Sequence, residues 1–91
     1  MTTVKLFGVM RDRAGTGAVE LPEGVTIRGI LERLSETYGP PARDLLLEER
    51  DGITVKRQPV VILIGGMPQL DLDRPVNRDE TVTIFPAVAG G

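Results

Sequence analysis

The residues best suited to chemistry lie at the C-terminal end of the chain, in the segment TIFPAVAGG of residues 83–91. Pro86 has no N–H with which to continue a sheet ladder, so it predicts the point where the chain leaves its last strand. Five residues follow it, none with a charged side chain, and they reach about 17 Å when extended. Small residues, two final glycines and a terminal carboxylate on Gly91 suit a tail that enters a narrow channel in a partner.

A carboxylate is a poor electrophile until it carries a good leaving group, and adenylation by ATP would supply one. This chain has no segment that could bind the nucleotide itself. Gly8, Gly15 and Gly17 lack the spacing and the following Lys-Ser/Thr pair of a phosphate-binding loop. We therefore expect a partner to bring the ATP.

Side-chain chemistry is restricted by two absences from the sequence, cysteine and histidine. They exclude thiol nucleophiles, zinc–thiolate clusters and the commonest general base. Besides the carboxylates, an enzyme acting alone would have Lys5, Lys56 and Tyr38, and these form no paired arrangement in the sequence.

Length and charge narrow the class of protein further. Ninety-one residues with a net charge of −2 predict one globular domain. The sequence has no basic stripe for nucleic acid and no apolar run that approaches a membrane span. The N-terminal residues do not resemble a signal peptide, so we expect a cytoplasmic protein.

A capped amphipathic helix is the strongest local signal. Thr26 is a good N-cap, and Ile27, Ile30, Leu31 and Leu34 then follow with helical spacing, as does Tyr38. Gly39 and the two prolines after it predict the helix end.

Strands are expected on both sides of this helix. Residues 3–7 and 18–21 predict a hairpin with a loose connection, and 60–64 and 81–85 predict two later strands. Between them, residues 42–49 predict a second short helix and 53–55 a brief strand. The order predicts an α+β roll, with a four- to five-stranded sheet and one main helix packed on one face.

Two features concern the face of the sheet opposite the helix. If Val82 and Ile84 meet the helix, strand alternation exposes Phe85 beside the tail, where it suits a partner contact unless a loop covers it. Residues 60–64 are apolar throughout, although a sheet with one solvated face should alternate. Either residues 42–57 fold over the second face, or that face docks onto another protein.

The chain resembles the MoaD/ThiS sulfur-carrier proteins, which are ubiquitin-like β-grasp domains. The resemblance is most specific over residues 75–91, PVNRDETVTIFPAVAGG, and includes Val4-Lys5-Leu6-Phe7, Arg11-Asp12, Ala14-Gly15 and the capped helix. It implies a mixed sheet in a β-grasp domain at 1–86 and a flexible tail at 87–91. One departure is Arg78-Asp79-Glu80, where the family usually has an acidic-glycine-acidic turn, and it leaves the conformation of this turn open.

The resemblance also implies a mechanism. An E1-like enzyme of the MoeB/ThiF type adenylates the Gly91 carboxylate with ATP and magnesium, and sulfur displaces AMP to leave a thiocarboxylate. The chain is then a carrier that binds no cofactor, and it donates sulfur in molybdopterin or tungstopterin synthesis as the small subunit beside a MoaE-type large subunit. By the same resemblance, Gly90 lets the tail enter the partner's channel and the residues before it line that channel. A docking surface on the folded domain contacts the partner as well. The partner-binding residues are Ala87, Val88 and Ala89 in the channel, Phe85 and Phe7 on the docking surface, and Pro86 between them.

Other roles fit the same tail. The thiocarboxylate could serve cysteine or thiamine-thiazole synthesis, since the ending IFPAVAGG also resembles carriers of the cysteine route. Alternatively, Gly91 could form isopeptide bonds with lysines of target proteins, as in ubiquitin-like modifiers. A fourth hypothesis, after the molybdopterin carrier, the other sulfur carriers and the modifier, is a binding subunit whose tail has no chemical role.

Overall fold

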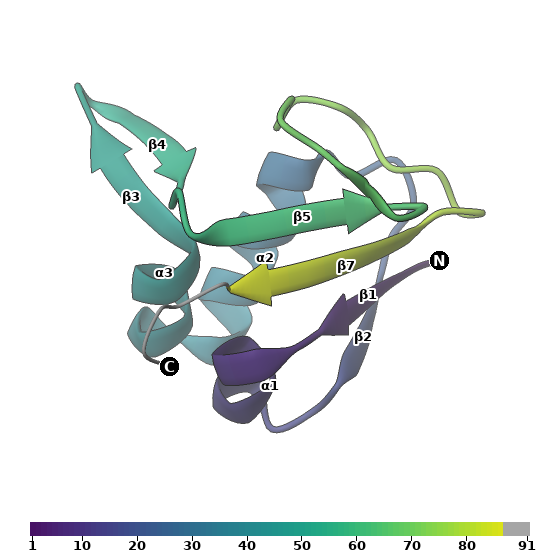
Figure 1. Cartoon of the computed structure of the whole chain (residues 1–91), viewed down its shortest axis with the longest axis horizontal. Coiled ribbons are helices and arrows are strands. Elements are labelled where there is room, and N and C mark those ends of the chain that lie inside the picture. The colour runs from purple at the N-terminus through teal and green to yellow at the C-terminus, as the bar shows by residue number, and fades with distance from the viewer. Residues whose placement is uncertain (87–91) are drawn as a thin grey trace.

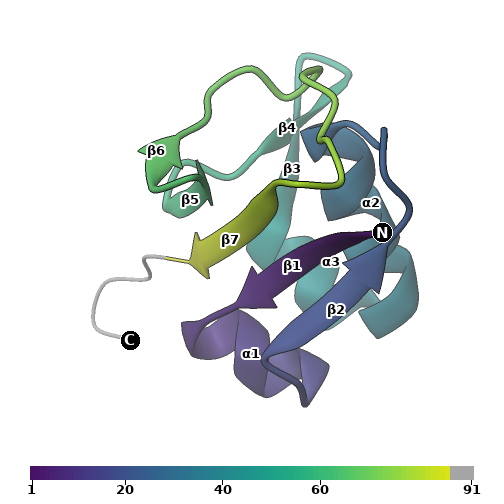
Figure 2. The same ribbon diagram turned by 90° about the vertical axis from the view of Figure 1, so that its right-hand side faces the viewer.

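A computed structural model describes residues 1–86 of the chain. A five-stranded mixed sheet, in the order β2-β1-β7-β5-β6, has three helices on one of its faces (Figures 1 and 2). The strands are β1 (Thr2–Leu6), β2 (Ala18–Leu21), β5 (Val60–Ile64), β6 (Met67–Pro68) and β7 (Thr81–Pro86). The helices are α1 (Gly8–Ala14), α2 (Ile27–Tyr38) and α3 (Pro40–Leu46), and β3 (Leu47–Arg50) and β4 (Ile53–Lys56) form a separate hairpin.

The first and last strands pair in parallel at the centre of the sheet. The register places Val4 opposite Val82 and Leu6 opposite Ile84, and all four side chains are buried. On either side, β2 pairs antiparallel with β1 and β5 pairs antiparallel with β7. This arrangement confirms the predicted mixed sheet of a β-grasp roll.

Helix α2 covers the buried face of the sheet as its sequence predicts. The Thr26 hydroxyl accepts a hydrogen bond from Gly29 N–H at 3.0 Å, which satisfies one of the unpaired donors of the first turn. The predicted apolar positions point into the core, and Ile27, Ile30, Leu31 and Leu34 are at most 2 % exposed. The core therefore lies between this helix and the central strands.

Two shorter helices accompany the main one: α3 is the second short helix expected at 42–49, with different bounds, whereas α1 was not predicted. The connection between the first two strands, expected to be loose, is α1, whose Met10 is fully buried. Gly15 ends this helix with φ of 74°, a left-handed conformation that suits glycine.

The middle of the chain also differs from its prediction. Pro40 and Pro41 begin α3, where proline fits because the first helical N–H groups need no intrahelical partner. The helix ends at Leu46, so residues 47–49 belong to β3 and were wrongly predicted as helical. Asp51 and Gly52 then form the tight turn to β4, both with positive φ.

The turn before the last strand, which departs from the family pattern, is closed by Glu80. Its carboxylate accepts from both terminal nitrogens of Arg74, at 3.0 and 2.6 Å, and from the backbone N–H of Asn77 at 3.0 Å. The Glu80 N–H donates to the Asn77 carbonyl. The hydrogen bond from Arg74, followed by that from Asn77, lowers the pKa of Glu80 below its ordinary value of 4.5. A side-chain network thus replaces a glycine turn.

Replacement of this carboxylate should reduce stability at neutral pH. Because the native pKa of Glu80 is lowered, its contribution is present above the unfolded value near 4.5 and declines as the pH falls through the native value. We therefore expect Glu80→Gln to lower the midpoint of urea unfolding at pH 7 and to make stability less sensitive to pH below 4.5. Glu36→Gln, an exposed change on α2, is the control, and an equal effect of both changes would contradict the assignment.

Candidate functional site

The strand alternation divides the sheet into a buried face and an open face. Thr2, Val4 and Leu6 of β1 point toward the helices, as do Val82, Ile84 and Pro86 of β7, and all six are buried. The side chains of the opposite face come from all five strands of the sheet. This open face consists of Thr3, Lys5, Ala18, Glu20, Val61, Leu63, Pro68, Thr81, Thr83 and Phe85.

Phe85 lies on the open face as predicted and is 44 % exposed. It stacks on Phe7, with 4.9 Å between the ring centroids and an interplanar angle of 0°. The expected exposure of Phe85 is confirmed, its direct contact with Phe7 was not predicted, and the partner-binding role of both residues stays a prediction. Phe7 follows β1, and its N–H donates to the carbonyl of Ile84, which fixes its ring beside the end of β7.

Pro86 differs in position from the other predicted docking residues. It is the last residue of β7, opposite Val60, and its side chain is buried. Gly8 lies against it: a Cβ at that position would sit 4.0 Å from the Pro86 ring and carbonyl oxygen, and its φ is +59°. The ring of Pro86 thus packs on the buried face of the sheet, at the end of β7. The partner-binding role predicted for it stays a prediction.

The remaining predicted site residues, Ala87, Val88, Ala89, Gly90 and Gly91, lie outside the described residues. The structure shows the position of Pro86, the residue that precedes them. The last position of β7 lies at the end of the sheet that carries the Phe7–Phe85 pair. The described chain therefore ends beside the aromatic pair, and the residues predicted to form the reactive tail begin at the next position.

The alternatives for the apolar strand β5 can now be compared. Val61 and Leu63 are half-buried on the open face. Residues 42–57 do not cover them, because α3 lies with the other helices and the β3–β4 hairpin stands off the sheet (Figures 1 and 2). Val61 lies opposite Phe85 in the register, so an apolar surface continues from the aromatic pair across β5. A docking face is the alternative that the geometry favours.

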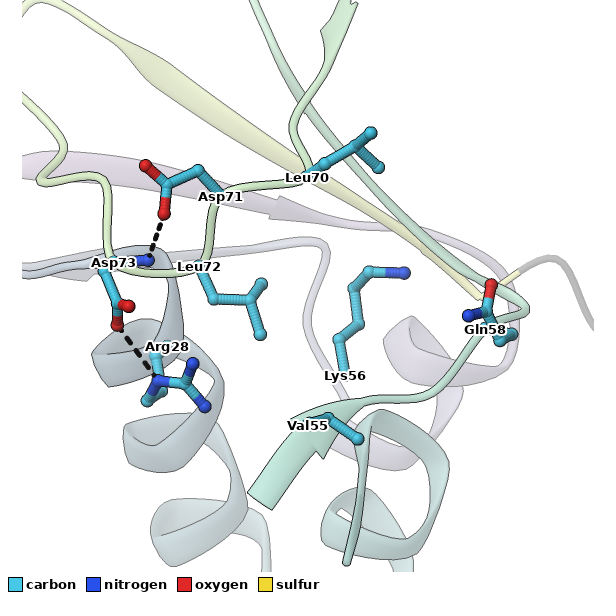
Figure 3. Close-up of a pocket in the computed structure, with 8 residues that line it drawn as sticks. All are labelled: Arg28, Val55, Lys56, Gln58, Leu70, Asp71, Leu72 and Asp73. Carbon is cyan, nitrogen blue, oxygen red and sulfur yellow. Dashed lines mark hydrogen bonds and ion pairs between the residues drawn. The ribbon is translucent and has the colours of Figure 1, made fainter. Parts of the chain in front are cut away.

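A cavity of about 410 Å³ lies elsewhere, between β4, α2 and the loop at residues 70–73 (Figure 3). Its two cations are already bound within the fold. Arg28 donates to the Thr54 carbonyl and to Asp73, and Lys56 donates to the carbonyls of Arg57 and Val60. Burial lowers the pKa of Lys56, and its hydrogen bonds go to backbone carbonyls rather than to Asp71 or Asp73, the two carboxylates that line the cavity. Arg28 thus joins helix α2 to the hairpin and to the loop at residues 70–73, and Lys56 joins the end of β4 to the start of β5.

Two further properties concern the described part of the chain. None of its helices has the length and apolar character needed to cross a membrane. Within residues 1–86, no cluster of three or more potential metal ligands occurs.

Solved structures with the same fold are numerous. Small archaeal modifier protein 1 from Methanosarcina acetivorans is 30 % identical, with a TM-score of 0.76, over 99 % of this chain and 95 % of that one. A structure described as an Amycolatopsis orientalis BexX/CysO complex matches with 23 % identity and a TM-score of 0.75, covering both chains completely. A putative molybdopterin converting factor subunit 1 from Pyrococcus furiosus matches with 24 % identity and a TM-score of 0.65, over 96 % and 97 % of the two chains.

The two matches below 25 % identity show the ubiquitin-like fold alone. A comparison with curated proteins found no match. The model of the ThiS family, in contrast, matches residues 4–91, which is nearly the whole chain and includes the glycine tail. The chain therefore belongs to the ThiS family of ubiquitin-like sulfur carriers and modifiers.

Proposed function

We propose that this protein is a sulfur carrier whose Gly91 carboxylate is adenylated by an E1-like enzyme and converted to a thiocarboxylate. The observation that carries the proposal is the ThiS-family match through residue 91, together with the aromatic pair beside the last strand. In the first step the carboxylate oxygen attacks the α-phosphorus of ATP and pyrophosphate leaves. Hydrosulfide, as the sulfur nucleophile, then attacks the acyl carbon and AMP leaves, so that a C–S bond replaces the C–O bond to AMP and the thiocarboxylate forms without a change of oxidation state.

The partner supplies the ATP, magnesium and catalytic groups in this scheme. The carrier supplies a substrate carboxylate at the end of a short chain and a surface by which the enzyme holds it. Its own cations at the cavity of Figure 3 are bound to backbone carbonyls and to Asp73, and its sequence has no cysteine or histidine. In this scheme the partner carries out the catalysis and the carrier itself catalyses no step.

For the sulfur acceptor, we propose the molybdopterin or tungstopterin route, with the chain as the small subunit of a molybdopterin synthase beside a MoaE-type subunit. The sequence resemblance in the last strand and tail supports this choice. The similarity in fold to the Pyrococcus furiosus converting factor is consistent with it. Cysteine and thiazole synthesis use the same activated end and differ only in the acceptor.

A second candidate function is protein modification. It is favoured by the 30 % identity to the small archaeal modifier protein 1 of Methanosarcina acetivorans. In that reaction the amine of a target lysine, rather than sulfur, attacks the activated Gly91 carbonyl and forms an isopeptide bond. Because both reactions begin with adenylation, they are separated by their products.

Intact-mass spectrometry of the untagged protein from its host, under conditions that preserve thioacids, distinguishes these products. We expect one oxygen of the Gly91 carboxylate to be replaced by sulfur. Target lysines joined to Gly91 by an isopeptide bond would instead indicate a modifier. Only unmodified chain, after incubation with the adenylating enzyme, ATP, magnesium and a sulfur donor, would contradict the proposal.

Deletion of Gly91 should abolish thiocarboxylate formation and leave thermal unfolding of the protein unchanged. The reason is that the reacting carboxylate would be displaced by one residue, while the core of residues 1–86 is intact. Deletion of Met1, which is 69 % exposed, is the matched control at the other end of the chain. Retention of full sulfur loading after deletion of Gly91 would contradict the role of this residue.

Phe85→Ala should weaken binding of the adenylating enzyme by about tenfold or more, because buried aromatic anchors dominate protein interfaces. Stability should fall by only about 1 kcal/mol, the scale of one aromatic pair, since the ring is 44 % exposed. Leu70→Ala is the control, since Leu70 is 87 % exposed and lies outside the open face. Equal affinities of the two variants, measured by calorimetry, would contradict docking through Phe85.

A further inference from the structure

The open face of the sheet has few charged side chains, and their positions indicate what kind of partner surface it fits. This inference rests on the proposed function. Of the ten side chains of this face, only Lys5 and Glu20 are charged. Glu20 accepts a hydrogen bond from the Thr3 hydroxyl at 2.7 Å. It lies in the row of Thr3 and Thr81, at the end of the face away from Phe85. The half of the face near the aromatic pair therefore has a single formal charge, and it is positive.

Lys5 lies at the border between the polar and apolar halves of the open face. In the register it is between Ala18 on β2 and Thr83 on β7, and the next position beyond Thr83 is Leu63. Its side chain is exposed, and none of the ion pairs found within residues 1–86 involves it. Its ammonium is thus available to an outside group.

The position of Lys5 next to the aromatic pair constrains any partner that docks there. Lys5 and Phe7 are two residues apart at the end of β1, so their Cα atoms are about 7 Å apart along the chain. A partner that covers Phe7 and Phe85 must also cover or border the Lys5 ammonium. An apolar partner surface would remove water from this charge without compensation, which is unfavourable unless an opposite charge pairs with it.

We propose that the adenylating enzyme docks on the open face. It presents an apolar pocket for Phe7 and Phe85, bordered by an Asp or Glu carboxylate that pairs with Lys5. The aromatic pair supplies the apolar anchor, and Lys5 sets the rotational register of the partner on the sheet. A partner without this carboxylate would leave a desolvated cation, so Lys5 acts as a specificity-determining residue. Its ion pair also makes association sensitive to salt.

The test is ATP–pyrophosphate exchange by the adenylating enzyme of the same organism, measured over a series of carrier concentrations. The variants are Lys5→Glu and Lys5→Arg, with Arg33→Glu as the matched control. Arg33 is exposed on α2, which covers the other face of the sheet. Each charge reversal subtracts two from the net charge of −2 and gives −4, so a general effect of net charge would appear equally in both.

We expect Lys5→Glu to raise the half-saturating carrier concentration by about tenfold or more, with Lys5→Arg and Arg33→Glu within about twofold of the unchanged protein. Salt should raise this concentration for the unchanged protein and much less for Lys5→Glu. Equal values for Lys5→Glu and Arg33→Glu, with normal exchange by the unchanged protein, would overturn the role of Lys5 alone. Absence of exchange with the unchanged protein would overturn the proposed function and this inference together.

Discussion

The parallel pairing of β1 with β7 is the constraint on which the rest of the structure depends. It brings the two ends of the described chain into the centre of one sheet and buries Val4, Leu6, Val82 and Ile84 completely or nearly so. Burial of an aliphatic side chain of this kind contributes about 2 kcal/mol, so the pair is a substantial part of the core. Parallel neighbours need a crossover connection, and the chain between them supplies α2, which closes the core from one side.

The same pairing determines where the candidate site lies. Because Leu6 is opposite Ile84, the residues that follow them, Phe7 and Phe85, meet at the same end of the sheet and stack. Gly8 then turns with positive φ past the buried ring of Pro86. The aromatic pair and the last residue of β7 are therefore held by the most deeply buried strands, which is the rigid support that the proposed function requires.

Local sequence signals predicted the secondary structure correctly where the apolar periodicity and a helix cap indicated the same element. The Thr26 cap and the apolar stripe of α2 gave that helix correctly, and strand alternation placed Phe85 on the open face. Helix α1 was missed because it has only seven residues, too few for a helical period to be distinguished from a loop. Its C-terminal Gly15 was the available signal, since a left-handed glycine commonly ends a helix.

The start and the end of α3 were both predicted wrongly, because in each case one local pattern fits more than one structure. Prolines end helices and also begin them, so Gly39-Pro40-Pro41 marks a boundary without stating which side is helical. The run Leu45-Leu46-Leu47 likewise fits a helix or a strand, and tertiary packing places its last member in β3. The contact of Phe7 with Phe85 joins residues 78 positions apart, and only the strand order brings them together.

In the proposed function the reacting carboxylate is at the end of the chain and recognition belongs to the folded body, so one fold can serve several acceptors. Adenylation uses only the terminal carboxylate and is chemically the same for a sulfur carrier and a modifier. The choice of partner must then come from the folded body, where the open face has a general apolar anchor in Phe7 and Phe85 and a single cation in Lys5 beside it. Apolar contacts supply affinity with little orientation, whereas an ion pair at the edge of the patch favours one orientation and disfavours partners with the wrong charge. If both proposals hold, substitutions around Lys5 change which partner is selected while the chemistry at Gly91 stays the same.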